Sequence, residues 1–370
     1  MHKERWLDSV KTFTWRRDGV YRGACGEHVA ATIKDVARRA RVSIASVSRT
    51  LNNSSSVTPG VRERVLRAAS RLHYTPHAAA RSLISRCTHT IGLLLPDIHG
   101  EYFSELIRGV DRAARARGLH LLVSCTHGNN AEAAEALRSM NGRVDGLLMM
   151  SPYLGGESLE DALPSGLPTV LMNTHEPAGI GAAFVVDDFG GARAMTTHLA
   201  AAGYQDIAHI RGPANDFQAL ERVRGYRAGL AADRVPRVID GDFTEESGYL
   251  AGRALAASDT PPEAVFAAND TMAIGCLFAL TEAGVRVPHD IALAGFDDIP
   301  LARFVSPPLT TVRVDIAAMG RRALESLVVS IADPNAAGRS SIETVPVELV
   351  VRASCGAGSR RPTPCEEAGS

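Results

Sequence analysis

The sequence contains no run of about 18 apolar residues, the length that a membrane-spanning helix needs. Hydrophobic residues make up 45% of its 370 residues and charged residues 22%, which is typical of a soluble globular protein. The first 30 residues lack both a continuous apolar segment and a clear cleavage site, so we expect no secretory signal peptide. We therefore expect a cytoplasmic protein without a membrane partner.

Cysteine is scarce and is not spaced for metal binding. The six cysteines are scattered without a C-x-x-C pair, which favours reduced thiols over disulfides or a zinc site. They are Cys25, Cys87, Cys125, Cys276, Cys355 and Cys365. The motifs G-x-G-x-x-G, G-x-x-x-x-G-K-[ST], H-E-x-x-H and G-x-S-x-G are also absent. We therefore expect no metal, no cofactor and no catalytic residues.

The net charge of −1 conceals a strong separation of charge along the chain. Residues 31–86 contain eleven Lys and Arg against only Asp35 and Glu63, so this segment carries +9 and the remainder carries −10. A compact basic segment joined to an acidic body is typical of a domain that binds a polyanion such as DNA. A solvated charged face is the alternative, and charge alone does not separate the two.

The basic segment has the periodicity of three short helices. Apolar residues recur at positions 33, 36, 37 and 40 behind a capping Thr32, which predicts the first helix. A second helix is predicted from Ile44 to about Leu51 with Ser43 as its cap, and a third over residues 59–72. Two short helices joined by a turn of three to four residues form a helix-turn-helix.

The second helix presents candidates for contact with DNA. Its N-terminal end is the part that enters the major groove, where a guanidinium makes a bidentate contact to guanine and small apolar groups contact thymine methyls. Hydroxyl groups suit phosphate oxygens, which set the register. The candidate base-reading residues are Ile44, Ala45, Ser46 and Arg49, and the candidate phosphate-binding residues are Thr32, Ser43 and Ser48.

From Thr90 onward, short apolar runs alternate with amphipathic segments, which predicts an α/β protein with parallel sheets covered by helices on both faces. The length is sufficient for two such sheets. The predicted strands are 91–95, 119–124, 146–150, 168–172, 184–186, 207–210, 264–267, 291–295 and 311–314. The predicted helices are 102–117, 131–140, 190–202, 217–232, 244–257, 270–283 and 315–331.

Polar and aromatic side chains follow several of these strands, at the sheet edge where open α/β proteins bind ligands. Charged and amide groups supply directional hydrogen bonds and rings supply stacking area, a combination that suits a sugar or a nucleobase. The candidate ligand-binding residues are Asp97, Tyr102, Phe103, Asn173, Arg222, Phe243, Asn269 and Asp297.

Several of these candidates also have a purely structural interpretation. Asn269 and its neighbour Asp270 stand where a helix begins, and capping is the favoured role for Asp270. Arg222 suits an exposed helix surface, and Phe103 and Phe243 suit the apolar core equally well.

The chain resembles the LacI/GalR (lactose-repressor) family. The resemblance is carried by TIKDVA (32–37), VSIASVSRTLN (42–52), RERVL (62–66) and YTPHAAARSL (74–83), and further blocks around Arg222, Asn269, Asp297 and Ser306 extend it to about Ser354. It implies that Asn52, Arg81 and Leu83 also bind DNA, with Leu83 from each subunit wedged into the minor groove. The chain departs from the family pattern at Arg41, where Gly or Asn is usual, and at His77 and Ile84.

The resemblance also implies an all-α helix-turn-helix headpiece and a periplasmic-binding-protein-like core of two doubly wound α/β subdomains. The expected headpiece spans 31–76, the hinge helix and linker 77–87, and the effector-binding and dimerisation domain 88–354. The first subdomain would hold 88–188 and 312–333, and the second 189–311 and 334–354. Residues 1–30 are expected to be a disordered extension, with a basic arm or a misassigned start as alternatives, and 355–370 a disordered tail.

These observations favour a transcriptional repressor that binds double-stranded DNA as a homodimer, with a higher oligomer as the alternative. Its operator would be a near-palindrome, and a small effector, a sugar or related metabolite, would bind between the two subdomains. A solute-binding protein of a transport system is the first alternative, but it needs a signal peptide and no headpiece. An enzyme on a doubly wound fold is the second, and it lacks recognisable catalytic motifs.

Overall fold

A computed structural model describes residues 31–51, 56–74, 87–150, 163, 166–174, 181–333 and 341–356. The chain divides into two compact units, residues 1–84 and 85–370, and each is described by itself. Three of the predicted DNA-binding residues, Asn52, Arg81 and Leu83, lie outside the described residues. No helix in these described ranges is long and apolar enough to cross a membrane.

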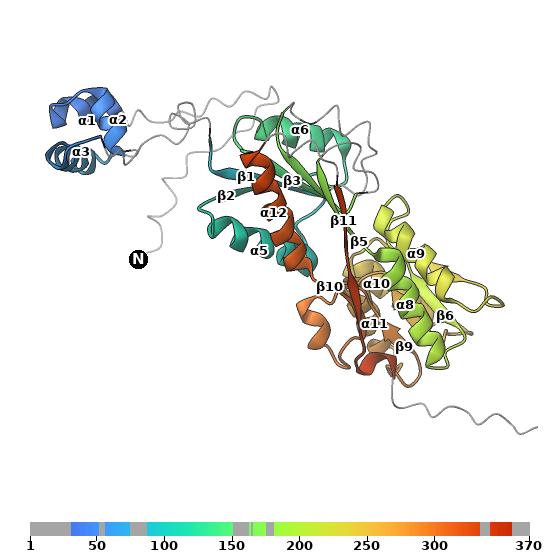
Figure 1. The fold of residues 1–370 in the computed structure, drawn as a ribbon. Helices are drawn as coiled ribbons and strands as arrows, with labels where there is room; N and C mark the ends of the chain where they lie inside the picture. Colours follow the sequence, from blue (N-terminus) through green and yellow to red (C-terminus); the bar gives the residue numbers. More distant parts are fainter. Residues whose placement is uncertain are drawn as a thin grey trace, which may run out of the picture. The chain divides into compact units, whose positions relative to one another are not determined.

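The first unit contains the predicted helix-turn-helix. Its helices are α1 (Ile33–Ala40), α2 (Ile44–Leu51) and α3 (Pro59–Arg71) (Figure 1). They enclose a small core around Val36, Val47 and Val65, which are fully buried. Arg41 ends α1 in the left-handed conformation, with φ 53°. An L-residue with a side chain pays roughly 1–2 kcal/mol for this conformation, which explains why Gly or Asn suits the position better.

The second unit has two lobes. The first lobe is built on a parallel six-stranded sheet in the order β11-β5-β4-β3-β1-β2. Its strands are β1 (Thr90–Leu95), β2 (His120–Cys125), β3 (Gly146–Met150), β4 (Thr169–Met172), β5 (Ala182–Val186) and β11 (Ser341–Val345), and its helices are α5 (Glu101–Arg115), α6 (Asn130–Met140) and α12 (Ile316–Ala332).

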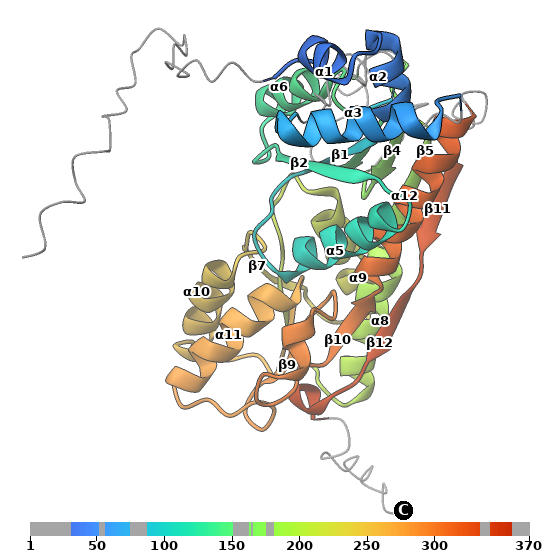
Figure 2. The ribbon, with the colours of Figure 1, turned by 90° about the vertical axis from the view of Figure 1, so that its left-hand side faces the viewer.

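Helices cover both faces of this sheet because successive side chains of a strand point to opposite sides. Leu148 of β3 packs into one cluster with residues of α5 and α12, whereas Leu147 and Met149 pack into another with residues of α6. Helices α5 and α12 lie side by side (Figures 1 and 2) and approach closely at Gly109, where a Cβ would fall 2.1 Å from the Ala317 carbonyl oxygen.

The second lobe is built on a parallel four-stranded sheet in the order β7-β6-β8-β9. Its strands are β6 (Ile207–Ile210), β7 (Arg237–Ile239), β8 (Ala264–Ala267) and β9 (Ala292–Ala294). Its helices are α8 (Asp188–Ala201), α9 (Phe217–Gly229), α10 (Glu245–Ala256), α11 (Asp270–Glu282) and the short 3-10 helix η1 (Pro300–Arg303).

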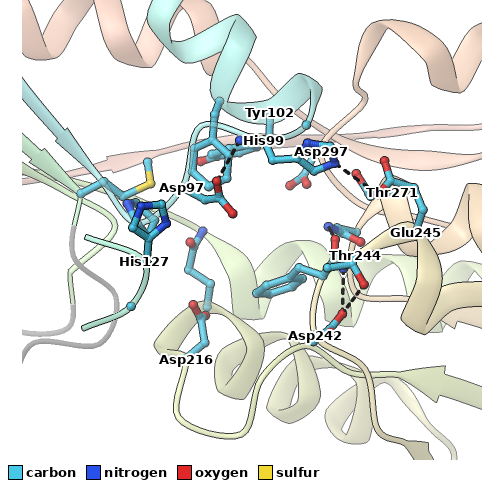
Figure 3. A pocket seen from close by; sticks show the side chains of 18 of the residues that line it. Asp97, His99, Tyr102, His127, Asp216, Asp242, Thr244, Glu245, Thr271 and Asp297 are labelled. Carbon is cyan, nitrogen blue, oxygen red and sulfur yellow. Dashed lines mark hydrogen bonds and ion pairs between the residues drawn. The ribbon is translucent and has the colours of Figure 1, made fainter. Parts of the chain in front are cut away.

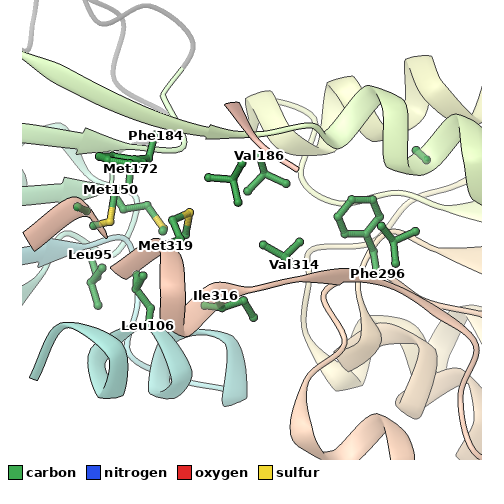
Figure 4. Close-up of a cluster of buried hydrophobic side chains, with 14 of the residues drawn as sticks. Leu95, Leu106, Met150, Met172, Phe184, Val186, Phe296, Val314, Ile316 and Met319 are labelled. Atoms are coloured by element: carbon green, nitrogen blue, oxygen red, sulfur yellow. The ribbon is translucent and has the colours of Figure 1, made fainter. Parts of the chain in front are cut away.

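The two lobes are joined by an antiparallel pair, β10 (Thr311–Val314) and β12 (Val347–Val350), which precedes the 3-10 helix η2 (Ala353–Cys355). A continuous apolar cluster runs through this connection, from Leu95 and Met172 of the first lobe through Val314 to Phe296 of the second (Figure 4). The assignment of 334–354 to the second subdomain is wrong for β11, because this strand pairs with β5 in the sheet of the first lobe.

Candidate effector cavity and DNA-reading helix

A cavity of about 400 Å³ lies between the two lobes of the second unit. It opens where strands end: Pro96 and Asp97 follow β1, Met150 ends β3, and Asn269 follows β8. The side chains converge on it from both lobes (Figure 3). Seven of the eight predicted ligand-binding residues line it, namely Asp97, Tyr102, Phe103, Arg222, Phe243, Asn269 and Asp297.

Arg222 is the centre of a buried charge network at the floor of the cavity. It projects from α9 with only 3% of its surface exposed, so the alternative of a surface arginine is excluded. Its Nε donates to Asp188 Oδ1 at 2.8 Å and its Nη2 to Asp297 Oδ1 at 3.2 Å. Its Nη1 donates to the Ala268 carbonyl oxygen, and its guanidinium lies 3.8 Å from the ring centroid of Phe296.

Burial dominates the electrostatics of this network. It raises the pKa of Asp188 to about 6 and that of Asp297 to about 7, although Arg222 opposes both shifts. Two carboxylates therefore compete for one guanidinium in a site with little solvent. Of the two, Asp297 lines the cavity, and a ligand hydroxyl that donates to it would stabilise its charged form, so this group is suited to binding polyols.

Asn269 caps the N-terminus of helix α11, and Asp270 has another role. Asn269 Oδ1 accepts a hydrogen bond from Met272 N at 2.9 Å, and its Nδ2 donates to the Phe243 carbonyl oxygen at 3.0 Å. The favoured assignment of the cap to Asp270 was therefore wrong, because this residue already lies in the first turn of α11. The buried Asp270 instead accepts from Ile299 N and Thr311 Oγ1, and burial raises its pKa well above the ordinary value.

Aromatic rings contribute from both lobes. Tyr102 and Phe103 of α5 meet edge to face at 5.5 Å, and Phe243 lies in the loop before α10. Phe243 has a φ of 72°, a conformation that a bulky residue adopts only when its surroundings impose it. Its ring lies against Gly212, where a Cβ would come within 2.4 Å of it. Both phenylalanines therefore face the cavity as well as packing against the core.

Asn173 is not among the residues that line the cavity. Its Nδ2 donates to the Tyr102 hydroxyl at 2.8 Å, so it lies one layer behind the ring. The direct contact of Asn173 with a ligand stays a prediction, and the geometry shows only that this residue supports Tyr102, which does line the cavity. Burial raises the pKa of Tyr102, which keeps the hydroxyl protonated and able to donate towards the cavity.

Sequence reasoning missed several residues that line the cavity: His99, His127, Asn215, Asp216, Gln218, Asp242, Thr244, Glu245 and Thr271. Asp216 caps α9 by accepting from Ala219 N at 2.9 Å. Asp242 accepts from both the amide and the hydroxyl of Thr244. Asp216 follows β6 and Asp242 follows β7, and a position after a strand could have identified both residues. However, β7 has only three residues and was not predicted as a strand.

Three of the four candidate base-reading residues are exposed on α2, and the fourth, Ser46, is partly buried. Ile44 has 45% of its surface exposed, an unusual position for a large apolar side chain, and Ala45 and Arg49 are also exposed. Val47 and Thr50 face the core. The exposed side is therefore free of any role in the core of the three helices.

The hydroxyl groups predicted to bind phosphate are partly occupied within the headpiece. Thr32 donates through both its amide and its Oγ1 to Asp35 Oδ2, at 2.9 and 2.7 Å. Ser43 Oγ accepts from Ser46 N at 3.1 Å and lies 2.9 Å from Ser46 Oγ. Capping therefore accounts for Thr32 and Ser43. A phosphate contact would require the Thr32 hydroxyl proton to turn away from Asp35, whereas the Ser43 hydroxyl can donate to a phosphate if Ser46 Oγ is the donor of their shared hydrogen bond.

Each of the two units of the chain matches a known protein family. Residues 32–77 match the family described as bacterial regulatory proteins, lacI family, and residues 196–355 match a periplasmic binding protein-like domain. The ribose operon repressor of Escherichia coli K12 is 37% identical over 311 residues, covering 82% of this chain and 94% of that protein. The repressor PurR of Vibrio parahaemolyticus is 34% identical and covers 82% of this chain and 92% of its own length.

Solved structures extend the likeness to the fold. A lac repressor dimer bound to operator and an anti-inducer has a TM-score of 0.78 at 28% identity, covering 88% of this chain and 99% of that one. A LacI family regulator from Enterococcus faecium with bound ribose has a TM-score of 0.63 at 26% identity, covering 72% and 98%. With a helix-turn-helix headpiece, a two-lobed core and relatives matched over nearly their full length, the chain belongs to the LacI family of bacterial transcriptional regulators.

Proposed function

We propose that an unphosphorylated sugar, bound in the cavity between the two lobes, controls how tightly this repressor holds its operator. The observation that carries the proposal is that the buried Arg222 and its partner Asp297 line a cavity whose walls include aromatic rings, while Asp188, outside the lining, also pairs with Arg222. Such a lining offers both donors and acceptors to ligand hydroxyls, and the rings offer stacking area to the apolar faces of a sugar ring.

The names of similar proteins support a sugar as the ligand of the cavity. Relatives at 34–37% identity are named ribose operon repressors, and a solved structure of similar fold holds ribose. The cavity volume of about 400 Å³ lies in the range of sites for small molecules. A purine base is the competing ligand, because relatives of 34–35% identity are named PurR.

The charge of the cavity argues against a phosphorylated ligand. Arg222 is the single Lys or Arg among the described lining residues, and Asp188 and Asp297 already pair with it. The acidic lining residues are Asp97, Asp216, Asp242, Glu245 and Asp297. A phosphate group would meet repulsion from these carboxylates without a free guanidinium to balance it.

Two copies of the headpiece would read the operator in the cytoplasm. The exposed side of α2 would enter the major groove, with Arg49, Ile44 and Ala45 at base edges, and the two-fold symmetry of the dimer would require a near-palindromic site. The family resemblance adds Asn52, Arg81 and Leu83 to these contacts. Ligand in the cavity would favour one closure angle of the lobes, and that angle would set whether the paired hinge segments order on DNA.

Isothermal titration calorimetry tests the ligand class directly. We expect purified protein to bind D-ribose or another neutral sugar, and to bind D-ribose 5-phosphate at least about tenfold more weakly, a difference of about 1.4 kcal/mol. Binding of adenine or guanine with no binding of any sugar would replace the proposal by the purine alternative. Equal affinity for the phosphorylated sugar would contradict the argument from cavity charge.

The role of the hinge is tested separately by Leu83→Ala. Fluorescence anisotropy should show a loss of operator affinity, because the wedge that bends the duplex is removed, while calorimetry shows unchanged sugar binding. A variant that binds operator as tightly as the wild type would remove Leu83 from the proposed contacts.

A further inference from the structure

Asp145 holds the chain at the point where it enters the first lobe. The residue directly precedes β3, and its carboxylate accepts hydrogen bonds from three successive residues at the start of the described core. Thr88 N and Oγ1 donate to Oδ1 at 2.6 and 2.8 Å, His89 N donates to Oδ2 at 2.7 Å, and Cys87 Sγ donates to Oδ2 at 3.0 Å. We call this set of four hydrogen bonds the Asp145 clamp.

The clamp requires a carboxylate. An ionised carboxylate offers about four lone-pair positions and no donor, so it satisfies four donors at once, whereas an amide would turn an NH2 group towards some of them. Burial would raise the pKa of Asp145, but the hydrogen bonds from Cys87, Thr88 and His89 outweigh it and lower the pKa. The same carboxylate raises the pKa of the Cys87 thiol, which therefore remains a protonated donor.

The two strands that begin at the clamp end at the effector cavity. Strand β3 starts directly after Asp145 and ends at Met150, which lines the cavity. Strand β1 starts directly after His89, and Pro96 and Asp97 after its end also line the cavity. The strands are hydrogen-bonded neighbours in parallel register, with Ile91 opposite Gly146. The clamp and one wall of the cavity are thus opposite ends of one rigid pair of strands.

The boundary between the two compact units lies between Ile84 and Ser85, only a few residues before the clamp. We propose that Asp145 is a positioning residue that fixes the departure point of the chain towards the DNA-binding unit and transmits the state of the cavity to it. Asp145 touches neither ligand nor DNA in this role. The part that concerns transmission rests on the proposed function, whereas the part that concerns positioning does not.

Operator affinity without effector tests positioning. In Asp145→Ala, releasing the clamped backbone adds an ordering cost to operator binding, so we expect about tenfold weaker affinity in fluorescence anisotropy. Affinity for nonspecific DNA, which depends on the headpiece charge, should stay unchanged. Thr88→Val, which removes one of the four hydrogen bonds and keeps the shape, should show a smaller loss in the same direction. If Asp145→Ala does not fold, Thr88→Val still tests the positioning role.

Two further variants separate positioning from general stability. Asn129→Ala removes the N-cap of α6 in the same lobe, where Asn129 Oδ1 accepts from Ala131 N at 2.8 Å, and should lower thermal stability without changing operator affinity. Cys87→Ser keeps a donor at the clamp and should behave as the wild type. Wild-type operator affinity in both Asp145→Ala and Thr88→Val would overturn the proposal, as would an equal loss of affinity in Asn129→Ala.

Transmission is tested with D-ribose as the probe. The fold-change in operator affinity caused by saturating D-ribose should shrink at least threefold in Asp145→Ala, while the D-ribose dissociation constant measured by calorimetry stays within twofold of the wild type. An undiminished response would overturn the transmission part. If the wild type binds no sugar, the proposed function fails, and the operator measurements without effector still decide the role of Asp145.

Discussion

The buried charged and amide groups of the cavity come from the second lobe, whereas exposed polar groups come from both lobes. From the second lobe, Arg222, Asn269 and Asp297 are buried and already hydrogen-bonded within the protein. From the first lobe, Asp97 and His127 are exposed and lie in loops after strands. Buried groups with fixed partners are preorganised for recognition, whereas exposed loop groups are freer to rearrange when a ligand binds. We propose that the buried groups of the second lobe recognise the ligand and that the exposed groups of the first lobe respond to closure.

The largest expected effect follows from removing the charge at the floor of the second lobe. Arg222→Ala leaves Asp188 and Asp297 buried without their shared cation, which costs about 3–5 kcal/mol of folding free energy. Sugar binding should fall below detection in calorimetry, while the headpiece still binds DNA. The matched control is Arg224→Ala on the same helix, which removes an exposed pair with Glu221 and should change the folding free energy by less than about 1 kcal/mol. Tight sugar binding by Arg222→Ala would contradict the assignment of recognition to this lobe.

A second expected effect is a pH dependence of the folding stability that comes from the second lobe. His209 of β6 is buried between the rings of Tyr226 and Phe266, and burial lowers its pKa to about 3 from the ordinary 6.5. Because the ring is neutral, its Nδ1 must be protonated to donate to the Phe266 carbonyl oxygen at 2.8 Å.

The folded pKa of His209 lies below the unfolded one, so its contribution to stability is present above pH 6.5 and is lost as the pH falls towards 3. Between pH 7 and pH 5, the wild type should lose about 2 kcal/mol of unfolding free energy relative to His209→Phe, measured by urea denaturation. Parallel pH profiles of the two proteins would show that this histidine is not held neutral.

A smaller effect is expected from the first lobe. Tyr102→Phe removes the hydroxyl that accepts from Asn173 and keeps the ring that lines the cavity. Sugar affinity should fall by about three- to tenfold, corresponding to one neutral hydrogen bond of about 1 kcal/mol. A loss as large as that of Arg222→Ala would remove the proposed difference between the lobes.

Hydrophobic periodicity was enough to predict most of the fold. The helices of the headpiece show the helical spacing of apolar residues, and strands β1, β3 and β8 are short, continuous buried apolar runs. Strands β7, β11 and β12 were missed because they are partly exposed. Strand β11 pairs with β5, which is about 155 residues distant in the chain, and such long-range pairing leaves little local signal.

The candidate site was predicted where strand ends carry charged or aromatic residues, as at Asp97 and Asp297. The sequence did not distinguish Asn269 from Asp270 as the cap, because adjacent polar residues at a helix start differ only in backbone conformation. It also did not show that Asn173 lies behind Tyr102, since depth in a site depends on packing between distant segments. Asp188 was missed as the partner of Arg222 for the same reason.

The central claim is that a ligand held between the lobes changes the affinity of the headpiece for operator DNA. The most direct measurement is fluorescence anisotropy at fixed salt concentration, with a near-palindromic duplex selected from a randomised library, in the presence and absence of neutral sugars. We expect a preference for the selected duplex over bulk DNA. We also expect the affinity for that duplex to change at least about fivefold, the lower end of typical coupling energies, when a sugar is added. Equal affinity for selected and bulk DNA, with and without the sugars, would contradict it.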